Sequence, residues 1–214
     1  RERGGGRARR AWAERGAGVY GAVAGLIAVR EVEVKGGAGQ VSDLSLLEPI
    51  FSVLGPEAMT HEVTGKVKRR LGSGSNTSSP RNVYATRDGK WIALSASIQS
   101  MAERVFRVIG REDMVDDPRF RTNPDRVKHR DQVDEILGGW IKARDRDEVL
   151  EIFGKGEVTA SPIYDISDIV KDEHFLEREI LVDLPDKDLG IAPMHNIIPR
   201  LTATPGTFRL PAPE

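Results

Sequence analysis

The sequence predicts an α/β protein whose centre is an α+β unit over residues 81–183. Two extended segments, 82–86 and 91–95, flank a turn whose Asp88-Gly89 pair suits the positive φ angles of a tight hairpin. Several segments with apolar residues at helical spacing follow, and their apolar faces can cover the hairpin. The chain has 214 residues, which is enough to bury a sizeable core.

The composition excludes several classes of protein. Hydrophobic residues make up 39% and charged residues 30%, an ordinary balance for a globular chain. Lysine and arginine total 32 against 33 acidic residues, so a generally basic nucleic-acid binder and an acidic solvating chain are both disfavoured. The absence of cysteine excludes disulfides, a thiolate nucleophile and cysteine-ligated metal clusters. We expect a cytoplasmic protein that binds no nucleic acid.

Residues 1–15 form an atypical basic arm. Six arginines and a run of three glycines give it low complexity, and Trp12 is its large apolar residue. We expect such an arm to be mobile. Binding to RNA is disfavoured because no aromatic residues are interleaved with the arginines.

The segment Gly16 to Val29 is predicted to be a helix that needs burial on every side, because it is apolar nearly all round. Its fourteen residues are fewer than the roughly 20 that span a bilayer, and no signal-peptide pattern surrounds it. We therefore expect no membrane association. Small residues along it allow another backbone or a ligand to approach closely: Gly18, Gly21, Ala22, Ala24, Gly25 and Ala28.

The next segments alternate between regular and irregular patterns. Residues 40–46 alternate as in a strand, and residues 47–54 are predicted to be helical with Pro49 in the first turn. From residue 55 to 79 the hydrophobic pattern lapses, and residues 72–80 have the composition of a loop.

Within the α+β unit, helices are predicted at 99–109, 130–143, 145–153, 166–171 and 174–179, an edge strand at 158–164 and a strand at 180–184. Asp145 is expected to cap the helix that it opens. Beyond Pro185 the chain is punctuated by prolines, which favours an extended strap.

No isolated motif identifies a chemistry. The four histidines, His61, His129, His174 and His195, lack metal-ligand spacing. The turn around Gly37 and Gly39 lacks the third glycine of a dinucleotide fingerprint, and neither G-x-S-x-G nor a phosphate-binding loop is present. We expect no metal site and no permanently bound cofactor.

Three motifs in order carry a resemblance to a known family. The run GVYGAVAGLIAVR precedes GAGQVSDLSLLE at residues 37–48, the block PRNVYATRDGKWIAL occupies residues 80–94, and DPRF at residues 117–120 is followed by Arg126. Together they resemble the class III CoA-transferases (CaiB/BaiF), which include formyl-CoA transferases and α-methylacyl-CoA racemases. The resemblance extends from about Gly16 to Glu214.

The resemblance implies an architecture of two domains. Family members are roughly twice this length and have a Rossmann-like large domain, a small α+β domain and a return to the large domain, and two chains interlock as a dimer. Residues 16–54 would end the first pass of the large domain, and residues 55–80 would be a linker with a Gly/Ser loop. Residues 81–183 would be the small domain and 184–214 the returning strap. The half that binds CoA and the helix after Pro213 would be missing.

The resemblance also implies the chemistry. An aspartate at the start of the small-residue helix attacks an acyl-CoA thioester, and a carboxylic acid later accepts CoA. Glu14 stands at this position, and no aspartate precedes Asp43. Its extra methylene displaces the nucleophile by about 1 Å, which can cost ~10²-fold in rate. A solvent-exposed glutamate without a catalytic role is the alternative interpretation.

Other residues receive supporting roles from the resemblance. The signature residues are interpreted as structural: Gly37, Gly39, Gln40, Asp43, Ser45 and Glu48. The loop Gly72-Ser73-Gly74 lies where transferases place a glycine-rich loop over the active site. A flexible interdomain loop is the alternative interpretation of that segment.

Two other functions stay open. One is the racemase/epimerase branch, whose histidine and aspartate act as an acid–base pair; the other is a non-catalytic fragment or subunit that pairs with a separate CoA-binding half. Association as a homodimer or with such a half is expected, because without its cover the helix from Gly16 to Val29 leaves an apolar patch. The change from the arm to the family pattern at Gly18 suggests a shifted reading frame in GC-rich DNA, and we expect little activity from this chain by itself.

Overall fold

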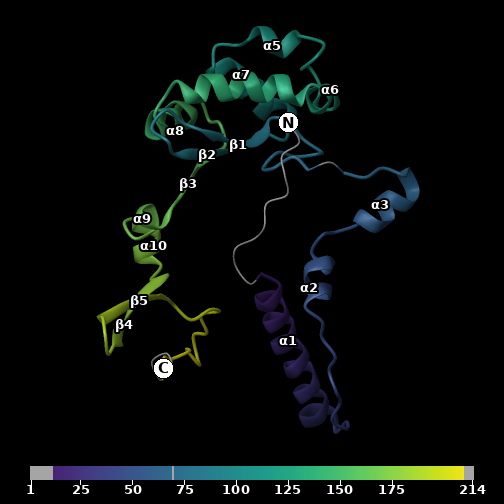
Figure 1. Cartoon of the computed structure of the whole chain (residues 1–214), viewed down its shortest axis with the longest axis vertical. Coiled ribbons are helices and arrows are strands. Elements are labelled where there is room, and N and C mark those ends of the chain that lie inside the picture. The colour runs from purple at the N-terminus through teal and green to yellow at the C-terminus, as the bar shows by residue number, and fades with distance from the viewer. Residues whose placement is uncertain (1–11, 69, 210–214) are drawn as a thin grey trace. The chain divides into compact units, whose positions relative to one another are not determined.

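The computed structural model describes residues 12–68 and 70–209, which divide after Gly72 into two compact units (Figure 1). Each unit is described by itself. Most of the predicted basic arm, residues 1–11, lies outside the described residues. Residues 12–15, the end of that predicted arm, belong instead to the first helix.

The first unit contains three helices. These are α1 (Trp12–Lys35), α2 (Leu47–Ser52) and α3 (Glu57–Thr64). Helix α1 extends the predicted helix at both ends and stops at Gly36, whose φ of 66° and N–H bond to the Val32 carbonyl (3.2 Å) form a left-handed cap. Ala17 is buried, whereas Val19, Leu26 and other apolar side chains of α1 are exposed.

One prediction for the first unit is wrong. Residues 40–46 form no strand, because a strand needs a neighbour for its backbone hydrogen bonds and no strand of the described chain pairs with them. The hydrophobic pattern of residues 55–71 indicated no element, but the structure forms helix α3 there. It ends at Gly65 with a φ of 64°, and Lys68 pairs with Glu57 at its start.

The second unit is built on a three-stranded antiparallel sheet. Its strands are β1 (Arg81–Ala85), β2 (Trp91–Ser95) and β3 (Ala160–Ile163), in the order β1-β2-β3. The predicted hairpin is confirmed: Ala85 pairs with Trp91 and Arg81 with Ser95, and Gly89 has a φ of 76°. Strand β3 lies at the edge, where the missing N–H of Pro162 is tolerated.

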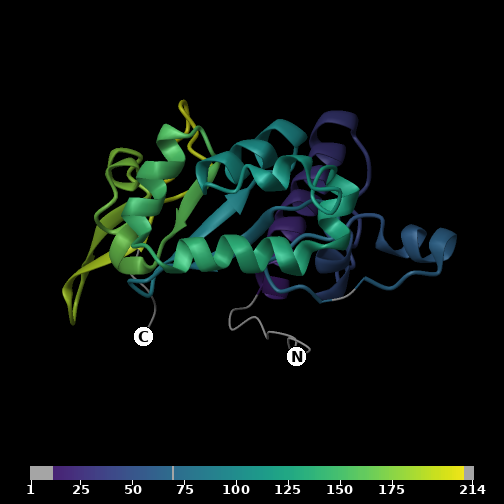
Figure 2. The same ribbon diagram turned by 90° about the horizontal axis from the view of Figure 1, so that it is seen from above.

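Helices cover one face of this sheet (Figures 1 and 2). In chain order they are α4 (Gln99–Val108), α5 (Asp113–Asp116), α6 (Asn123–Lys128), α7 (Arg130–Lys142) and α8 (Arg146–Lys155). Helix α7 contacts β1 and α8 contacts β3. The predicted periodicity is confirmed, because Val105 and Phe106 of α4 and Leu137 of α7 are buried with Ile92 of the sheet.

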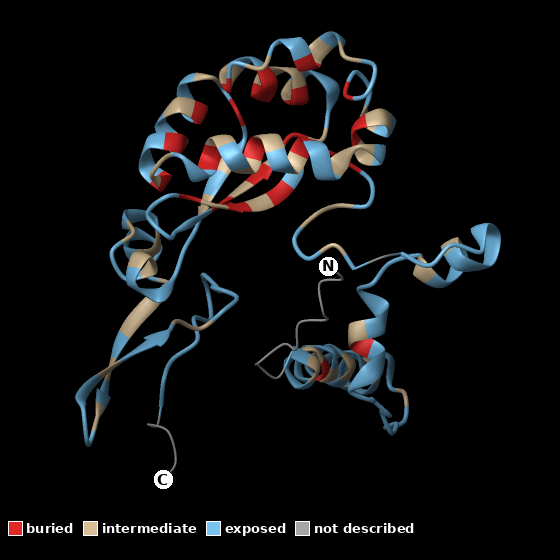
Figure 3. Ribbon diagram, turned by 45° about the horizontal axis from the view of Figure 1, so that its top comes forward, coloured by how far each residue is buried: buried red, intermediate tan, exposed pale blue. Residues whose placement is uncertain are grey.

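This core holds most of the buried residues of the described chain (Figure 3). Each large aliphatic or aromatic side chain that is fully buried there contributes about 1.5–3 kcal/mol of transfer free energy. The rings of Trp140 and Phe153 stack in parallel with their centroids 5.4 Å apart. The core therefore accounts for the stability of the second unit.

The capping prediction for Asp145 is wrong. Asp145 precedes α8, but its carboxylate accepts no hydrogen bond from the helix. Instead, both oxygens bind the Arg87 guanidinium at 2.9 Å, because a planar fork offers two parallel charge-assisted bonds.

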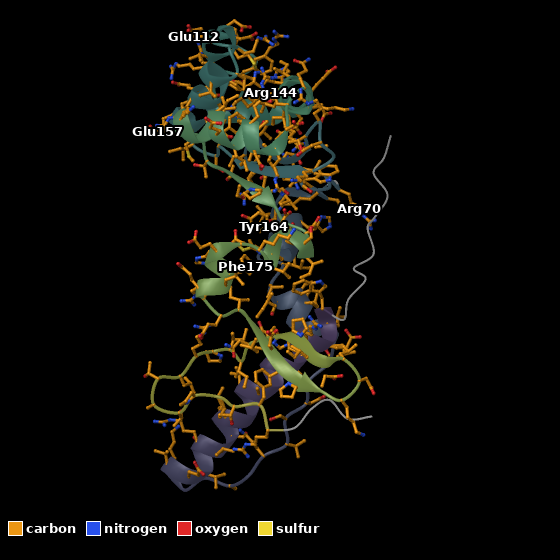
Figure 4. All side chains as sticks on the ribbon, turned by 90° about the vertical axis from the view of Figure 1, so that its left-hand side faces the viewer. Arg70, Glu112, Arg144, Glu157, Tyr164 and Phe175 are labelled. Carbon is orange, nitrogen blue, oxygen red and sulfur yellow. The ribbon has the colours of Figure 1, made fainter. Side chains whose placement is uncertain are left out.

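A connecting segment follows β3. It contains α9 (Ile166–Ile169) and α10 (Glu173–Glu177). Arg146 at the start of α8 holds Asp168 of α9 with two bonds of 2.9 and 3.1 Å. The rings of Tyr164 and Phe175 lie side by side with centroids 6.4 Å apart (Figure 4).

The prediction of an extended strap beyond Pro185 is wrong in part. Strands β4 (Leu181–Asp186) and β5 (Gly190–His195) form an antiparallel hairpin, and β4 crosses the predicted boundary at residue 183. The Asp186 carboxylate accepts the N–H groups of Asp188 and Leu189, and Gly190 has a φ of 76°. These turn contacts are local, so a strand pair forms despite the prolines. The division into domains otherwise stays a prediction.

Candidate functional site

Glu14 lies in the first turn of α1 with its side chain exposed. Its carboxylate makes no hydrogen bond or ion pair with any residue that the structure describes. Helix N-termini favour negative charge, through their free N–H groups and the helix dipole. The Glu14 carboxylate is thus exposed and has no partner among the described residues.

Helix α2 packs against the beginning of α1 on the side of Gly16. A Cβ built on Gly16 would stand 3.5 Å from the Pro49 Cβ, so glycine allows the close approach of the two helices. The Tyr20 hydroxyl and the Ser52 hydroxyl are 2.8 Å apart. The structure thus brings the end of the predicted signature to the turns that follow Glu14.

Ser45 and Glu48 form a reciprocal cap at the start of α2. The Glu48 N–H donates to the Ser45 Oγ at 3.1 Å, and Glu48 Oε2 accepts from the Ser45 N–H and hydroxyl at 3.2 and 2.7 Å. These bonds lower the pKa of Glu48, with the bond from the Ser45 side chain as the largest cause. The spacing is that of a capping box, which supports the structural interpretation of these two residues.

The other signature residues differ in their surroundings. A Cβ on Gly37 would lie 3.0 Å from Glu31 Cγ and 3.3 Å from the Glu31 carbonyl oxygen, so a larger residue would crowd the end of α1. Gly39 has nothing within 4 Å of such a Cβ. Gln40 and Asp43 are exposed and make no side-chain bond to another described residue.

The Gly/Ser loop continues from Gly72, which has a φ of 65°, through Ser73 and Gly74. Its second part, residues 75–79, is held by side chains from two helices. Asn123 accepts the Ser79 N–H at 3.2 Å and donates to the Thr77 carbonyl at 2.9 Å, and Arg130 donates to the Ser75 carbonyl at 2.5 Å. Residues 75–79 are therefore anchored, while the role of Gly72-Ser73-Gly74 stays a prediction.

Arg126 is the central anchor of the loop. It is completely buried and donates to the carbonyls of Ser79 (2.7 Å) and Phe120 (3.0 Å) and to the Gln99 side chain (2.9 Å). Burial lowers the pKa of Arg126 from its usual value. The motif that links DPRF to Arg126 thus has a structural basis: it fixes the chain that leads into β1.

A pocket lies on the sheet face opposite the helices. Its volume is about 280 Å³, and its lining includes Ser73, Arg81, Ser95, Thr159 and Ser161. Sequence reasoning missed Arg81 as a functional candidate. The alternation of the strand could have found it, because Arg81, Val83 and Ala85 face away from the buried Asn82 and Tyr84.

Two other kinds of site find no support in the described part of the chain. No group of three or more histidine or acidic side chains among residues 12–68 and 70–209 could hold a metal ion. None of the helices described is both long and apolar enough to cross a membrane.

Comparison with known proteins supplies the family context. The sequence model of CoA-transferase family III matches residues 3–214. The chain is 29% identical to the succinyl-CoA–D-citramalate CoA-transferase of Chloroflexus aurantiacus over 89% of its own length and 47% of that enzyme. It is 33% identical to the alpha subunit of the succinyl-CoA–L-malate CoA-transferase of the same species, over 89% of this chain and 44% of that subunit. The chain therefore spans about half the length of the curated relatives it matches.

Solved structures agree on the fold. A CaiB/BaiF family protein from Brucella suis superposes with a TM-score of 0.78 at 24% identity, over 95% of this chain and 52% of that one. The orthorhombic crystal form of Rv3272 from Mycobacterium tuberculosis gives a TM-score of 0.73 at 18% identity, over 92% of this chain and 51% of that one. One expectation is corrected: the family match begins at residue 3, so the basic arm lies within it rather than ahead of it.

Proposed function

This chain belongs to CoA-transferase family III, and we propose that it takes part in transferring CoA from an acyl-CoA to a carboxylic acid through a covalent intermediate on Glu14. The observation that supports this proposal is the unpaired, exposed carboxylate of Glu14 in the first turn of α1. CoA and acyl-CoA are substrates in this scheme, and no bound cofactor is required.

The proposed reaction balances in four steps. The Glu14 carboxylate attacks the donor thioester, which expels CoA thiolate and leaves a mixed anhydride. The thiolate attacks the glutamyl carbonyl, releases the donor acid and forms a glutamyl-CoA thioester. The acceptor carboxylate then displaces CoA to form a second anhydride, and CoA attacks the acceptor carbonyl and frees Glu14. Covalent catalysis divides one difficult exchange into easier steps, and the N-terminus of α1 would stabilise the negative charge that develops.

Two features reduce the activity that we propose for this chain alone. Glutamate in place of aspartate moves the reacting oxygen by about 1 Å, which can cost ~10²-fold in rate. The chain also spans about half the length of the relatives it matches, so any contacts to CoA that those relatives make outside the matched part are not supplied by its residues. Succinyl-CoA as donor, with malate or citramalate as acceptor, is the proposed substrate set, on the names of the relatives.

The test is to trap the covalent intermediate. The chain is incubated with succinyl-CoA and then hydroxylamine, which converts a glutamyl thioester to a hydroxamate, and the labelled peptide is identified by mass spectrometry. We expect the label on Glu14, none in Glu14→Gln, and a stronger label in Glu14→Asp. The matched control is Glu33→Gln, which removes another exposed glutamate of α1 and should keep the label. Label at another residue, or label retained in Glu14→Gln, would refute the proposal.

We also propose that the apolar surface of α1 binds a second polypeptide, either the CoA-binding half of the family or another copy of this chain. Val19, Leu26 and Ile27 are each more than 60% exposed. Exposed apolar area of this kind marks a contact surface in a protein of ordinary composition. Analytical ultracentrifugation should show association that weakens in Leu26→Glu; a monomer at all concentrations, alone and mixed with a CoA-binding half from a relative, would contradict it.

The racemase or epimerase branch is kept as the alternative activity. The relatives named above are CoA-transferases, which favours transfer. Loss of optical activity from a chiral 2-methylacyl-CoA, without exchange of CoA between acids, would instead identify the alternative.

A further inference from the structure

The pocket on the open face of the sheet contains an arginine without a partner. Arg81 begins β1 and is exposed, and its side chain makes no hydrogen bond or ion pair with residues 12–68 or 70–209. Elsewhere in the same unit Arg87 and Arg146 each hold a carboxylate through two bonds. A guanidinium is a fork of donors that fits two oxygens of one carboxylate, so a free one next to a pocket is suited to an oxyanion.

The strand register places hydroxyl groups beside this arginine. Arg81 pairs with Ser95 across β1 and β2, and the Ser95 N–H donates to the Thr159 carbonyl at 3.1 Å. The three residues therefore form one row across the sheet, in which side chains of neighbouring strands stand about 4.5–5.5 Å apart. Ser73 lines the same pocket. One cation and several hydroxyls are thus within reach of a single small ligand.

The floor of the pocket explains why there is room for such a ligand. In the next row Val83 pairs with Ala93, and Ala93 pairs with Ser161. These side chains are small, and the volume of about 280 Å³ is just below the range of about 300–1,000 Å³ for pockets that take drug-sized molecules. The pocket suits a short acid rather than a whole CoA thioester. No acidic side chain is among its lining residues.

We propose that this pocket binds the carboxylate of a small organic acid, with the Arg81 guanidinium as its main contact and the neighbouring hydroxyls as further donors. The binding of this acid to the pocket does not depend on the proposed function.

The experiment is a binding titration of the whole chain, labelled with ¹⁵N, by sodium succinate at constant ionic strength. We expect saturable shifts of the amides of Arg81, Ser95 and Thr159. A bond to a charged group is worth about 1.5–3 kcal/mol, so Arg81→Gln should raise the Kd about tenfold or more. Arg81→Lys should bind with intermediate strength, because it keeps the charge and loses the fork.

The matched control is Arg121→Gln, which removes the same charge from an exposed arginine that has no side-chain partner among the described residues. It should leave the Kd within about twofold of wild type, since Arg121 is not among the residues that line the pocket. Equal weakening in both variants, or shifts that never saturate, would overturn the proposal. Shifts that follow protein concentration instead of succinate would identify a carboxylate of a second copy in the pocket and also overturn it. Failure of the trapping experiment on Glu14 would leave this result unaffected.

Discussion

Replacing Arg126 by methionine should lower the free energy of unfolding of the second unit more than a substitution of similar size at the surface. The substitution keeps much of the volume of a completely buried side chain and removes its donors. The carbonyls of Ser79 and Phe120 then lose their buried partner at 2.7 and 3.0 Å. A buried acceptor left without a partner costs about 1–3 kcal/mol, so the expected loss of unfolding free energy is about 3 kcal/mol.

The assay is urea unfolding followed by the fluorescence of the tryptophans of the second unit, Trp91 of β2 and Trp140, which stacks on Phe153 in the core. A Trp12→Phe background removes the signal of the first unit. Arg126→Lys keeps the charge and should lose less, about 1–2 kcal/mol, since one ammonium replaces part of the fork. Arg121→Met serves as the exposed control and should stay within about 0.5 kcal/mol of wild type. A loss below about 1 kcal/mol for Arg126→Met would refute the role of Arg126 as an anchor.

Three further predictions test other contacts. Arg146→Gln should release the carboxylate of α9 that Arg146 holds at 2.9 and 3.1 Å, and hydrogen exchange of the α9 and α10 amides should become faster with little change in α4. Asp117 accepts hydrogen bonds from the side chain and backbone N–H of Arg119, and these lower its pKa to about 2. The stability that Asp117 contributes is therefore present above its pKa in the unfolded chain and is lost as the pH falls toward 2. An NMR titration of Asp117 should give this value, and an unchanged pKa in Arg119→Gln would contradict the proposed cause. Gly37→Ala should destabilise the end of α1 through its contact with Glu31 at 3.0 Å, while Gly39→Ala should not, as judged by exchange of the last α1 amides.

Much of the second unit could be predicted from the sequence because its signals are local. The Asp88-Gly89 pair specifies a turn, and the alternation of Trp91–Ser95 specifies which side chains face the core. Apolar spacing located α4, α7 and α8 within a few residues, since each helix buries one face. The family motifs likewise located Glu14 and the Gly/Ser loop as candidates for the site.

What remained undecided depends on partners that are distant in the sequence. Residues 40–46 alternate like a strand and form none, because no neighbouring strand is available to them in the described chain. Asp145 was expected to cap a helix, but Arg87, fifty-eight residues earlier, offers its carboxylate two bonds.

The same reason separates the two arginines that matter most in the second unit. By itself, the sequence predicted a strand that begins directly after Arg81, at residue 82, and it placed Arg126 after the DPRF motif. Only the tertiary structure decided that Arg126 is buried among carbonyls while Arg81 stands unpaired beside a pocket. The residue type sets the charge and length of each side chain. The free energy of that charge, however, depends on which groups the fold brings within a few ångströms of it.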